Sequence, residues 1–409
     1  MFLLKRAYFN RTLIIKGLIT AILFSSALYL SYFSIENKIL NTIFALLSLY
    51  FILKIPRISL FHAGFFIGLF WFYWISFSFG FYGLSYLVPF VILGIALISA
   101  FLFLATAIID KTYMRAAFVF GLSYIEPFGF NWLKIELLFV DSFFDVSKVT
   151  LALILLSVLL LVYNRLLLFT IPVIVAFFLQ TPSTVLEPEL KIALPDYSFK
   201  QDYKWNKKNL NVIIEKNLEQ IDTAIKENYD VVVLPETTFP LLLNKEFNLL
   251  NKLSLKSKEI TIIAGGLYFE KEEYRNSTYI FKNEVLKIAH KVVLVPFGEA
   301  VPLPEKLKNL INDTFYDGSS DYTKASKPTN FEIEGSKFRN AICYEATKDE
   351  IYENLDDVKY IIATSNNAWF TPSIEPTLQK RMMKFYAKKN NIIIYHQANG
   401  SANEVIKPY

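Results

Sequence analysis

The sequence predicts two domains of different kinds: an α-helical domain that spans a membrane several times, followed by an α/β domain. The 409-residue chain is 54% hydrophobic and only 19% charged, whereas a soluble domain usually carries about 25% charged residues. Residues 1–185 hold only 12 Lys and Arg and 6 Asp and Glu, and the other 30 and 31 lie in residues 186–409. We therefore expect a membrane domain over 1–185 and a globular domain over 186–409. The net charge of +5 comes from the membrane part, so it predicts no nucleic-acid partner.

Seven apolar runs in the first part are candidates for spanning helices. A helix that crosses a bilayer needs about 20 apolar residues; the third and fourth runs reach this length comfortably, whereas the second, sixth and seventh are short. The fifth run is the weakest, because Arg115 lies near its start and Glu126 follows its end. A cleaved signal peptide is the alternative for the first run, but the later runs favour a retained helix. The runs are Leu13–Phe33, Ile39–Leu53, Leu60–Phe79, Tyr86–Ile109, Met114–Ile125, Val149–Tyr163 and Leu166–Leu179.

The charges between these runs predict the orientation of the chain. With about seven spans, one side of the membrane carries most of the Lys and Arg, and the other carries fewer of them mixed with Asp and Glu. Positive loops stay in the cytoplasm, so we expect a cytoplasmic N-terminus and an α/β domain outside the cytoplasm. One span fewer would place the α/β domain on the cytoplasmic side instead. The residues of the positive side are Lys5, Arg6, Arg11, Lys54, Arg57, Lys111, Arg115 and Arg165; the other side has Lys38, Lys134 and Lys148.

After a short linker near Pro182 and Pro188, the apolar pattern changes to alternating strands and helices, which is typical of an α/β layer fold. Leu210–Glu227 has apolar residues at helical spacing, and Pro376–Lys389 is a second expected helix. Pro302–Asn330 has little periodicity and predicts a long loop of the kind that often forms a lid or a binding loop. The expected strands are Asp230–Leu234, Ile260–Ala264, Ser277–Lys282, Glu284–Ala289, Val292–Val295, Phe338–Cys343, Tyr360–Thr364 and Ile392–Tyr395.

Cys343 is the only cysteine of the chain, so it cannot form an intramolecular disulfide. One interpretation is a catalytic thiol, and the alternative is a small buried apolar residue. The sequence has no G-x-S-x-G, H-E-x-x-H, P-loop or G-x-G-x-x-G motif. The three histidines, His62, His290 and His396, are scattered along the chain, which argues against a zinc site.

Polar residues beside the expected strands offer partners for this thiol. Glu236 directly follows a strand, where partial burial would raise the pKa of a carboxyl group toward that of a useful base. Lys291 directly precedes another strand, where an ammonium group could stabilise an oxyanion. Glu299 ends the turn after that strand. Each of these residues has an ordinary surface role as its alternative, but a thiol needs a base, and no histidine is suitably placed.

These residues and their neighbours resemble a known family. Leu234-Pro235-Glu236, Lys291 and Ile342-Cys343-Tyr344-Glu345 are similar to the Glu-Lys-Cys triad of the nitrilase superfamily. The motifs around them resemble the apolipoprotein N-acyltransferase family more specifically, as does a multi-span N-terminal half. These motifs are Leu294–Pro302 (LVPFGEAVP), Thr364–Phe370 (TSNNAWF) and Gln397–Gly400 (QANG).

The resemblance implies an αββα sandwich, a covalent mechanism, and neither a metal nor a cofactor. By resemblance, Glu236 is the general base, Lys291 stabilises the oxyanion and Cys343 is the nucleophile. The backbone N–H of Tyr344 would assist at the oxyanion, and Glu299 and Glu345 would support the site. Substrate-contacting residues are expected at Trp205, Phe297 and Asn367.

The implied activity is acyl transfer through a Cys thioester in the bacterial inner membrane, with the catalytic domain on the periplasmic side. The implied donor is a membrane phospholipid, and the acceptor is the α-amine of diacylglyceryl-cysteine in an apolipoprotein. Two features depart from the family: Leu234 stands where a Trp is common, and no further apolar run lies between Gly400 and Tyr409, where the family usually has a spanning helix.

Two other functions are compatible with parts of the sequence. A membrane-tethered amidase or nitrilase would share the triad, but it would not account for the spans. A non-catalytic membrane module with a decayed nitrilase domain would not account for the presence of Glu236, Lys291 and Cys343 together. The nature of the acceptor distinguishes the two enzymes, because a hydrolase releases an acid to water and a transferase needs an amine.

Overall fold

The chain forms two compact units in the computed structural model. The first comprises Met1–Pro182 with Pro372–Lys389, and the second comprises Ser183–Thr371 with Asn390–Tyr409. Most of the predicted loop Pro302–Asn330 lies outside the described residues. The structure describes the whole chain except residues 1–9, 82, 181–182, 302–303, 305–320 and 409.

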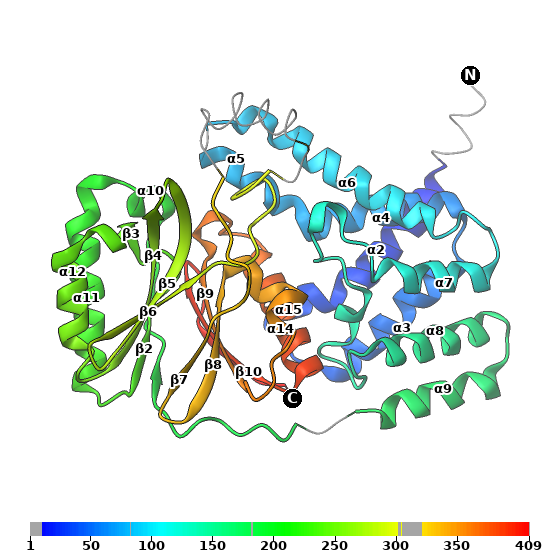
Figure 1. The fold of residues 1–409 in the computed structure, drawn as a ribbon. Helices are drawn as coiled ribbons and strands as arrows, with labels where there is room; N and C mark the ends of the chain where they lie inside the picture. Colours follow the sequence, from blue (N-terminus) through cyan, green and yellow to red (C-terminus); the bar gives the residue numbers. More distant parts are fainter. Residues whose placement is uncertain (1–9, 82, 181–182, 302–303, 305–320, 409) are drawn as a thin grey trace. The chain divides into compact units, whose positions relative to one another are not determined.

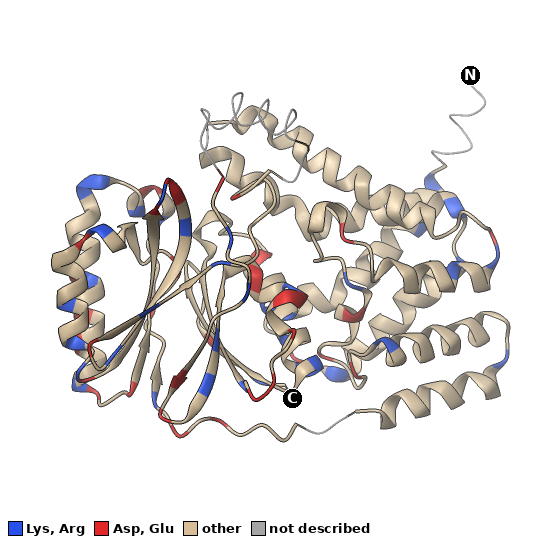
Figure 2. Cartoon of the chain, in the orientation of Figure 1, with Lys and Arg blue, Asp and Glu red and all other residues tan. Residues whose placement is uncertain are grey.

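Each of the seven apolar runs forms a helix of the first unit (Figure 1). Figure 2 shows long stretches of these helices without a charged residue, and large apolar side chains face outward, with Leu167 87% and Phe90 70% exposed. Within the described residues, Arg11–Tyr32, Arg57–Phe81 and Ser85–Ala105 are long and apolar enough to cross a membrane. The helices of the unit are α2 (Arg11–Tyr32), α3 (Lys38–Lys54), α4 (Arg57–Phe72), η1 (Tyr73–Phe77), α5 (Ser78–Phe81), η2 (Ser85–Leu87), α6 (Val88–Ala105), α7 (Thr112–Leu122), η3 (Pro127–Gly129), η4 (Ile135–Phe139), α8 (Lys148–Val162), α9 (Leu166–Phe178) and α15 (Glu375–Asn390).

Small residues let α4 and α6 pack closely. Gly64 and Gly68 are spaced four residues apart on α4, so both lie on one face of the helix. A Cβ at Gly64 would lie 2.4 Å from the Ser99 carbonyl oxygen, and one at Gly68 would lie 2.8 Å from Ala96 Cα. Close approach through such small-residue pairs is typical of helix packing in membranes, where apolar side chains gain little by leaving lipid.

Arg115, whose charge weakens the prediction that the fifth run spans the membrane, has a structural role. The Arg115 guanidinium on α7 is buried and donates to the carbonyl oxygens of Ile52, Leu53 and Ile55 at 3.3, 3.2 and 2.7 Å. It also pairs with Asp110 at 2.7 Å. The last carbonyl groups of a helix have no partner within the helix, so Arg115 satisfies the C-terminal end of α3.

The helix α15 joins the first unit although it follows strand β9 in the chain. The chain leaves the second unit after Thr371, contributes α15 to the first unit, and returns to the second at Asn390. Within the first unit, Arg381 and Lys384 of α15 bind the Asp141 carboxylate, each at 2.5 Å. Its position between two expected strands predicts instead that this helix belongs to the α/β domain.

The second unit contains two β-sheets that pack face to face. In the first sheet the order is β1-β2-β4-β5-β6, with β3 paired to β4, and in the second it is β11-β10-β9-β8-β7. The strands are β1 (Ile192–Ala193), β2 (Val231–Val233), β3 (Phe239–Leu242), β4 (Thr261–Glu270), β5 (Glu273–Lys282), β6 (Val285–His290), β7 (Asn330–Ile333), β8 (Ser336–Ile342), β9 (Tyr360–Asn366), β10 (Ile393–Asn399) and β11 (Glu404–Ile406). The helices of the unit are α10 (Gln201–Lys204), η5 (Lys207–Asn209), α11 (Leu210–Lys226), η6 (Leu243–Lys245), α12 (Phe247–Lys256), η7 (Cys343–Thr347), α14 (Asp349–Tyr352) and η8 (Asn367–Trp369).

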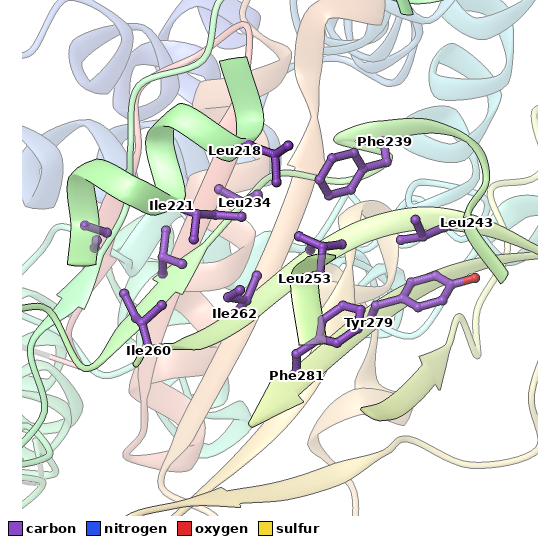
Figure 3. Packing of buried hydrophobic residues seen from close by; sticks show 14 of the residues in the cluster. Leu218, Ile221, Leu234, Phe239, Leu243, Leu253, Ile260, Ile262, Tyr279 and Phe281 are labelled. Atoms are coloured by element: carbon purple, nitrogen blue, oxygen red, sulfur yellow. The ribbon is translucent and has the colours of Figure 1, made fainter. Parts of the chain in front are cut away.

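The alternation of side chains along the strands builds two hydrophobic layers, because successive residues point to opposite faces of a sheet. On one face of the first sheet, Val231 and Val233 pack with Phe338 and Ile362 of the second sheet. On the other face, the first sheet packs against α11 and α12 through the cluster in Figure 3. Its labelled members are Leu218, Ile221, Leu234, Phe239, Leu243, Leu253, Ile260, Ile262, Tyr279 and Phe281.

One predicted strand is wrong. Val292–Val295 lies in irregular backbone after β6 rather than in a sheet. The N–H groups of Val292 and Val293 donate to the Glu345 carboxylate, and that of Val295 donates to Glu299 Oε2 at 2.9 Å. Side-chain carboxylates therefore take the place of a neighbouring strand. The strand was predicted from its apolar side chains, and these do not show which acceptors the backbone N–H groups bind.

Candidate active site

Cys343 lies where a central strand of the second sheet ends. Strand β8 ends at Ile342, and Cys343 begins the 3₁₀ turn η7. Its backbone φ is +56°, a left-handed conformation that is uncommon for residues other than glycine and that often occurs at functional sites. The side chain is half-buried. The turn therefore holds a partly accessible thiol in a defined conformation at the edge of the sheet.

Lys291 lies between two carboxylates immediately after β6. Its side chain is 1% exposed, and Nζ lies 2.9 Å from Glu299 Oε1 and 3.7 Å from Glu236 Oε1. Burial alone lowers the pKa of the lysine, but the negative charges of Glu299 and Glu236 outweigh burial and raise its pKa well above the ordinary range. Lys291 is therefore an ammonium group at neutral pH. It can stabilise negative charge but cannot act as a base.

Glu236 follows β2 and the Leu234-Pro235 step, and its side chain is buried. The Asn276 amide of β5 donates to Glu236 Oε1 at 2.8 Å and to Glu299 Oε1 at 3.2 Å. Asn276 thus links the two carboxylates that flank Lys291. Asn276 is not among the residues predicted from the sequence, because one Asn inside an alternating strand carries no pattern that marks a site.

Glu345 connects the turn that carries Cys343 to the segment after Lys291. Its buried carboxylate accepts hydrogen bonds from the backbone N–H groups of Ile342, Val292 and Val293 at 2.7, 2.6 and 3.1 Å. Burial raises the pKa of Glu345 to about 7, against the lowering effects of Lys291 and these three N–H groups. Because the folded state holds this proton more tightly, the stability contributed by Glu345 falls as pH rises from its unfolded pKa to about 7.

Replacing Glu345 with glutamine should disturb this connection. A glutamine amide has one acceptor oxygen and one NH₂ group in place of the two carboxylate oxygens. Either the backbone N–H of Ile342 or those of Val292 and Val293 would therefore face this NH₂ group, which is also a donor. We expect a loss of about 1–3 kcal/mol in the free energy of unfolding, the usual cost of unsatisfied buried groups, together with slower alkylation of Cys343 by iodoacetamide. Thermal unfolding and intact-mass labelling measure both effects. The control is Glu332→Gln on β7, an exposed site, and equal behaviour of the two variants would contradict the role of Glu345.

A second buried lysine lies beside the site and was also missed. Lys204 is the last residue of α10 and is 3% exposed. Its Nζ donates to the Glu236 carbonyl oxygen at 2.9 Å and to Thr237 Oγ1 at 2.8 Å. The resemblance to the family points to the neighbouring Trp205 instead. A single Lys in a polar segment is usually exposed, so its burial was not predictable from its neighbours.

The remaining predicted residues occupy different places. Tyr344 follows Cys343 in η7 and is buried. Trp205 is 40% exposed, and Phe297 has a φ of +61° in the turn that ends at Ala300, to whose carbonyl oxygen it donates at 2.8 Å. Asn367 is buried after β9 and donates to Ser401 Oγ at 3.0 Å. The substrate roles of Trp205, Phe297 and Asn367 stay predictions.

Comparison with known proteins matches both units. The profile of the apolipoprotein N-acyltransferase integral membrane domain covers residues 11–181, and that of the carbon-nitrogen hydrolase domain covers residues 200–408. An apolipoprotein N-acyltransferase of Wolinella succinogenes is 43% identical over 96% of this chain and 95% of its own length. One of Helicobacter hepaticus is 35% identical over 93% and 96%. A solved carbon-nitrogen hydrolase of Helicobacter pylori covers 51% of this chain and 73% of its own, at 13% identity and a TM-score of 0.39.

The two packed sheets belong to a carbon-nitrogen hydrolase domain, joined here to an integral membrane domain. The predicted fold class is confirmed. The chain belongs to the apolipoprotein N-acyltransferase family, and it is a membrane protein.

Proposed function

We propose that this chain transfers an acyl chain from a membrane phospholipid to the α-amine of diacylglyceryl-cysteine at the N-terminus of an apolipoprotein. The reaction proceeds in two steps through a thioester on Cys343. The observation that carries this proposal is the Lys291 ammonium buried between Glu236 and Glu299, in a chain of this family. Its fixed positive charge suits an oxyanion, and Glu236 is a carboxylate within reach of the same ammonium.

In the first step the thiol of Cys343 attacks the ester carbonyl carbon of the phospholipid. Glu236 takes the thiol proton as the C–S bond forms, and the carbonyl oxygen becomes an oxyanion stabilised by Lys291 and the backbone N–H of Tyr344. The C–O bond to glycerol then breaks, and Glu236 returns the proton to the departing oxygen. The products are a lysophospholipid and a thioester, which divides one difficult transfer into two easier ones.

In the second step the α-amine of the acceptor attacks the thioester carbon. Glu236 takes a proton from the amine, the oxyanion forms at the same place, and the C–S bond breaks to give an amide. The thiolate of Cys343 regains the proton and the site is restored. Glu299 and Glu345 support the geometry, and Trp205, Phe297 and Asn367 are proposed to contact the substrates.

The location proposed for this chemistry is the periplasmic side of the bacterial inner membrane. The distribution of Lys and Arg supports a cytoplasmic N-terminus, and an odd number of spans near seven in residues 1–185 would then place residues 186–409 outside. Outward-facing apolar residues of the first unit support contact with lipid chains. A membrane site would let both lipid substrates reach the thiol without leaving the bilayer.

Trapping the thioester tests this proposal directly. The purified full chain, incubated with phospholipid alone, is expected to gain the mass of one acyl chain at Cys343. Addition of a diacylated lipopeptide should then remove this mass and yield a triacylated peptide. An active enzyme without the mass shift would contradict the thioester. Loss of the adduct to water as fatty acid, at the same rate with and without the lipopeptide, would instead identify a hydrolase.

A further inference from the structure

A buried cation outside the proposed triad binds the backbone that carries Glu236. Both hydrogen bonds of Lys204 Nζ go to this one segment, at the Glu236 carbonyl oxygen and the Thr237 hydroxyl. Burying an ammonium group is costly unless its partners compensate. Neither partner here carries a formal charge of its own at the bonded atom. Burying a lysine with two neutral acceptors therefore costs more free energy than burying an apolar side chain in the same space. This cost points to a role of Lys204 in the site.

The segment that Lys204 binds has a strained backbone. Thr237 has a φ of +46°, which is unfavourable for a β-branched residue. Gly265 of β4 packs so closely against this segment that a Cβ would lie 2.3 Å from Thr237 N and 2.7 Å from the Pro235 carbonyl oxygen. The turn at 235–237 thus contacts both β4 and the Lys204 ammonium. Strained conformations persist only where the surrounding residues hold them in place, and Lys204 is one of the residues that hold this turn.

The reacting groups act on the charge of Lys204. Burial lowers the pKa of Lys204 to about 7, while the negative charges of Glu236 and Cys343 act in the opposite direction and favour the ammonium form. Lys291 Nζ lies 3.7 Å from Glu236 Oε1. Glu236 is therefore close to two buried lysines, Lys291 at its carboxylate and Lys204 at its backbone carbonyl oxygen.

We propose that Lys204 is a positioning residue for the reaction: it holds the 235–237 turn so that Glu236 keeps its place beside Lys291, the place from which Glu236 takes the proton of the Cys343 thiol. This inference rests on the proposed function for the role of Glu236. It adds to the site a residue that contacts the base through its backbone rather than through its carboxylate.

The first test measures acyl-enzyme formation. Lys204→Met keeps the aliphatic stem but removes the charge and both hydrogen bonds. We expect the initial rate of mass gain with phospholipid to fall about 100-fold, the scale of loss that a displacement near 1 Å causes in an active site. The matched control is Lys207→Met, an exposed lysine three residues away, which should stay within about twofold of the parent chain. An unchanged rate in Lys204→Met would overturn the proposal.

The second test separates positioning from a structural role. Because Cys343 is the only cysteine, iodoacetamide labelling followed by intact mass reports on this thiol alone and needs no substrate. Lys204→Met should slow labelling about tenfold, as a one-unit change in thiol ionisation would. In a Glu236→Gln background the same change should cost less than about twofold, because residues that act through one another are not additive. Equal slowing in both backgrounds would overturn the proposal.

A variant with a smaller chemical change tests the same proposal if Lys204→Met does not fold. Thr237→Val is nearly isosteric and removes only the hydroxyl that accepts from Lys204. It should slow labelling about threefold, a smaller effect than loss of the whole ammonium; labelling at the parent rate would overturn the proposal. Should the labelling results hold while the parent chain forms no acyl-enzyme, the proposed function would fail and the link from Lys204 through Glu236 to Cys343 would stand.

Discussion

Replacing Cys343 with alanine should abolish acyl transfer and leave the protein folded. The sulfur is the nucleophile that the protein supplies in the proposed scheme, so we expect activity to fall on the order of 10⁴-fold or more. The side chain is small and half-buried, so the free energy of unfolding should change by no more than about 1 kcal/mol. Transfer from phospholipid to a diacylated lipopeptide, measured together with thermal unfolding, checks both parts.

Cys343→Ser is the informative companion variant. A hydroxyl group fits the same space but ionises far less readily than a thiol, so the first step should be strongly slowed. A folded alanine variant that still moved an acyl group would show that the mechanism is wrong. A serine variant as active as the parent chain would show that thiol ionisation does not limit the first step.

Replacing Arg381 with methionine should destabilise the first unit by about 3–5 kcal/mol, the usual cost of removing one partner from a buried ion pair. Arg381 is buried on α15, and besides Asp141 its guanidinium donates to the carbonyl oxygens of Ala27 and Leu137 at 3.0 and 2.7 Å. The variant would leave the largely buried Asp141 carboxylate and two carbonyl groups without this donor. Thermal unfolding in detergent, with limited proteolysis around α15, measures the loss.

Two control variants test the origin of that effect. Lys384→Met removes a more exposed cation from the same carboxylate, so it should cost only about 1 kcal/mol. Arg381→Met combined with Asp141→Asn should recover part of the loss, because the unpaired charge is removed as well. If the double variant were as unstable as the sum of its single variants, the ion pair would not be the cause.

The pattern of apolar residues predicted most of the secondary structure. Runs of apolar residues marked the helices of the first unit, and Val231–Val233 has the continuous apolar character of a strand buried on both faces. The failure at Val292–Val295 has a clear cause, since Glu345 and Glu299 bind backbone groups that a neighbouring strand would otherwise bind. The contact with Glu345 is long-range and leaves no local pattern.

Within the site, the sequence indicated the residues whose chemistry is unusual for their position. Glu236 after a strand, Lys291 beside a strand and a lone Cys343 could each be selected from local context and family motifs. Asn276 and Lys204 could not, because their residue types are ordinary for a strand and for a polar segment. Only burial, and the partners found at Glu236, make them notable.

The sequence by itself determined that this chain has an apolar helical part and an α/β part, because composition and periodicity are local properties. It also identified the family and the lone thiol, since both rest on residue types at short spacing. The tertiary structure decided that α15 belongs to the first unit, that Glu345 joins two loops, and that Lys204 binds the backbone carbonyl oxygen of Glu236. Each of these depends on residues far apart in the chain, brought together because buried charges and backbone groups must find partners.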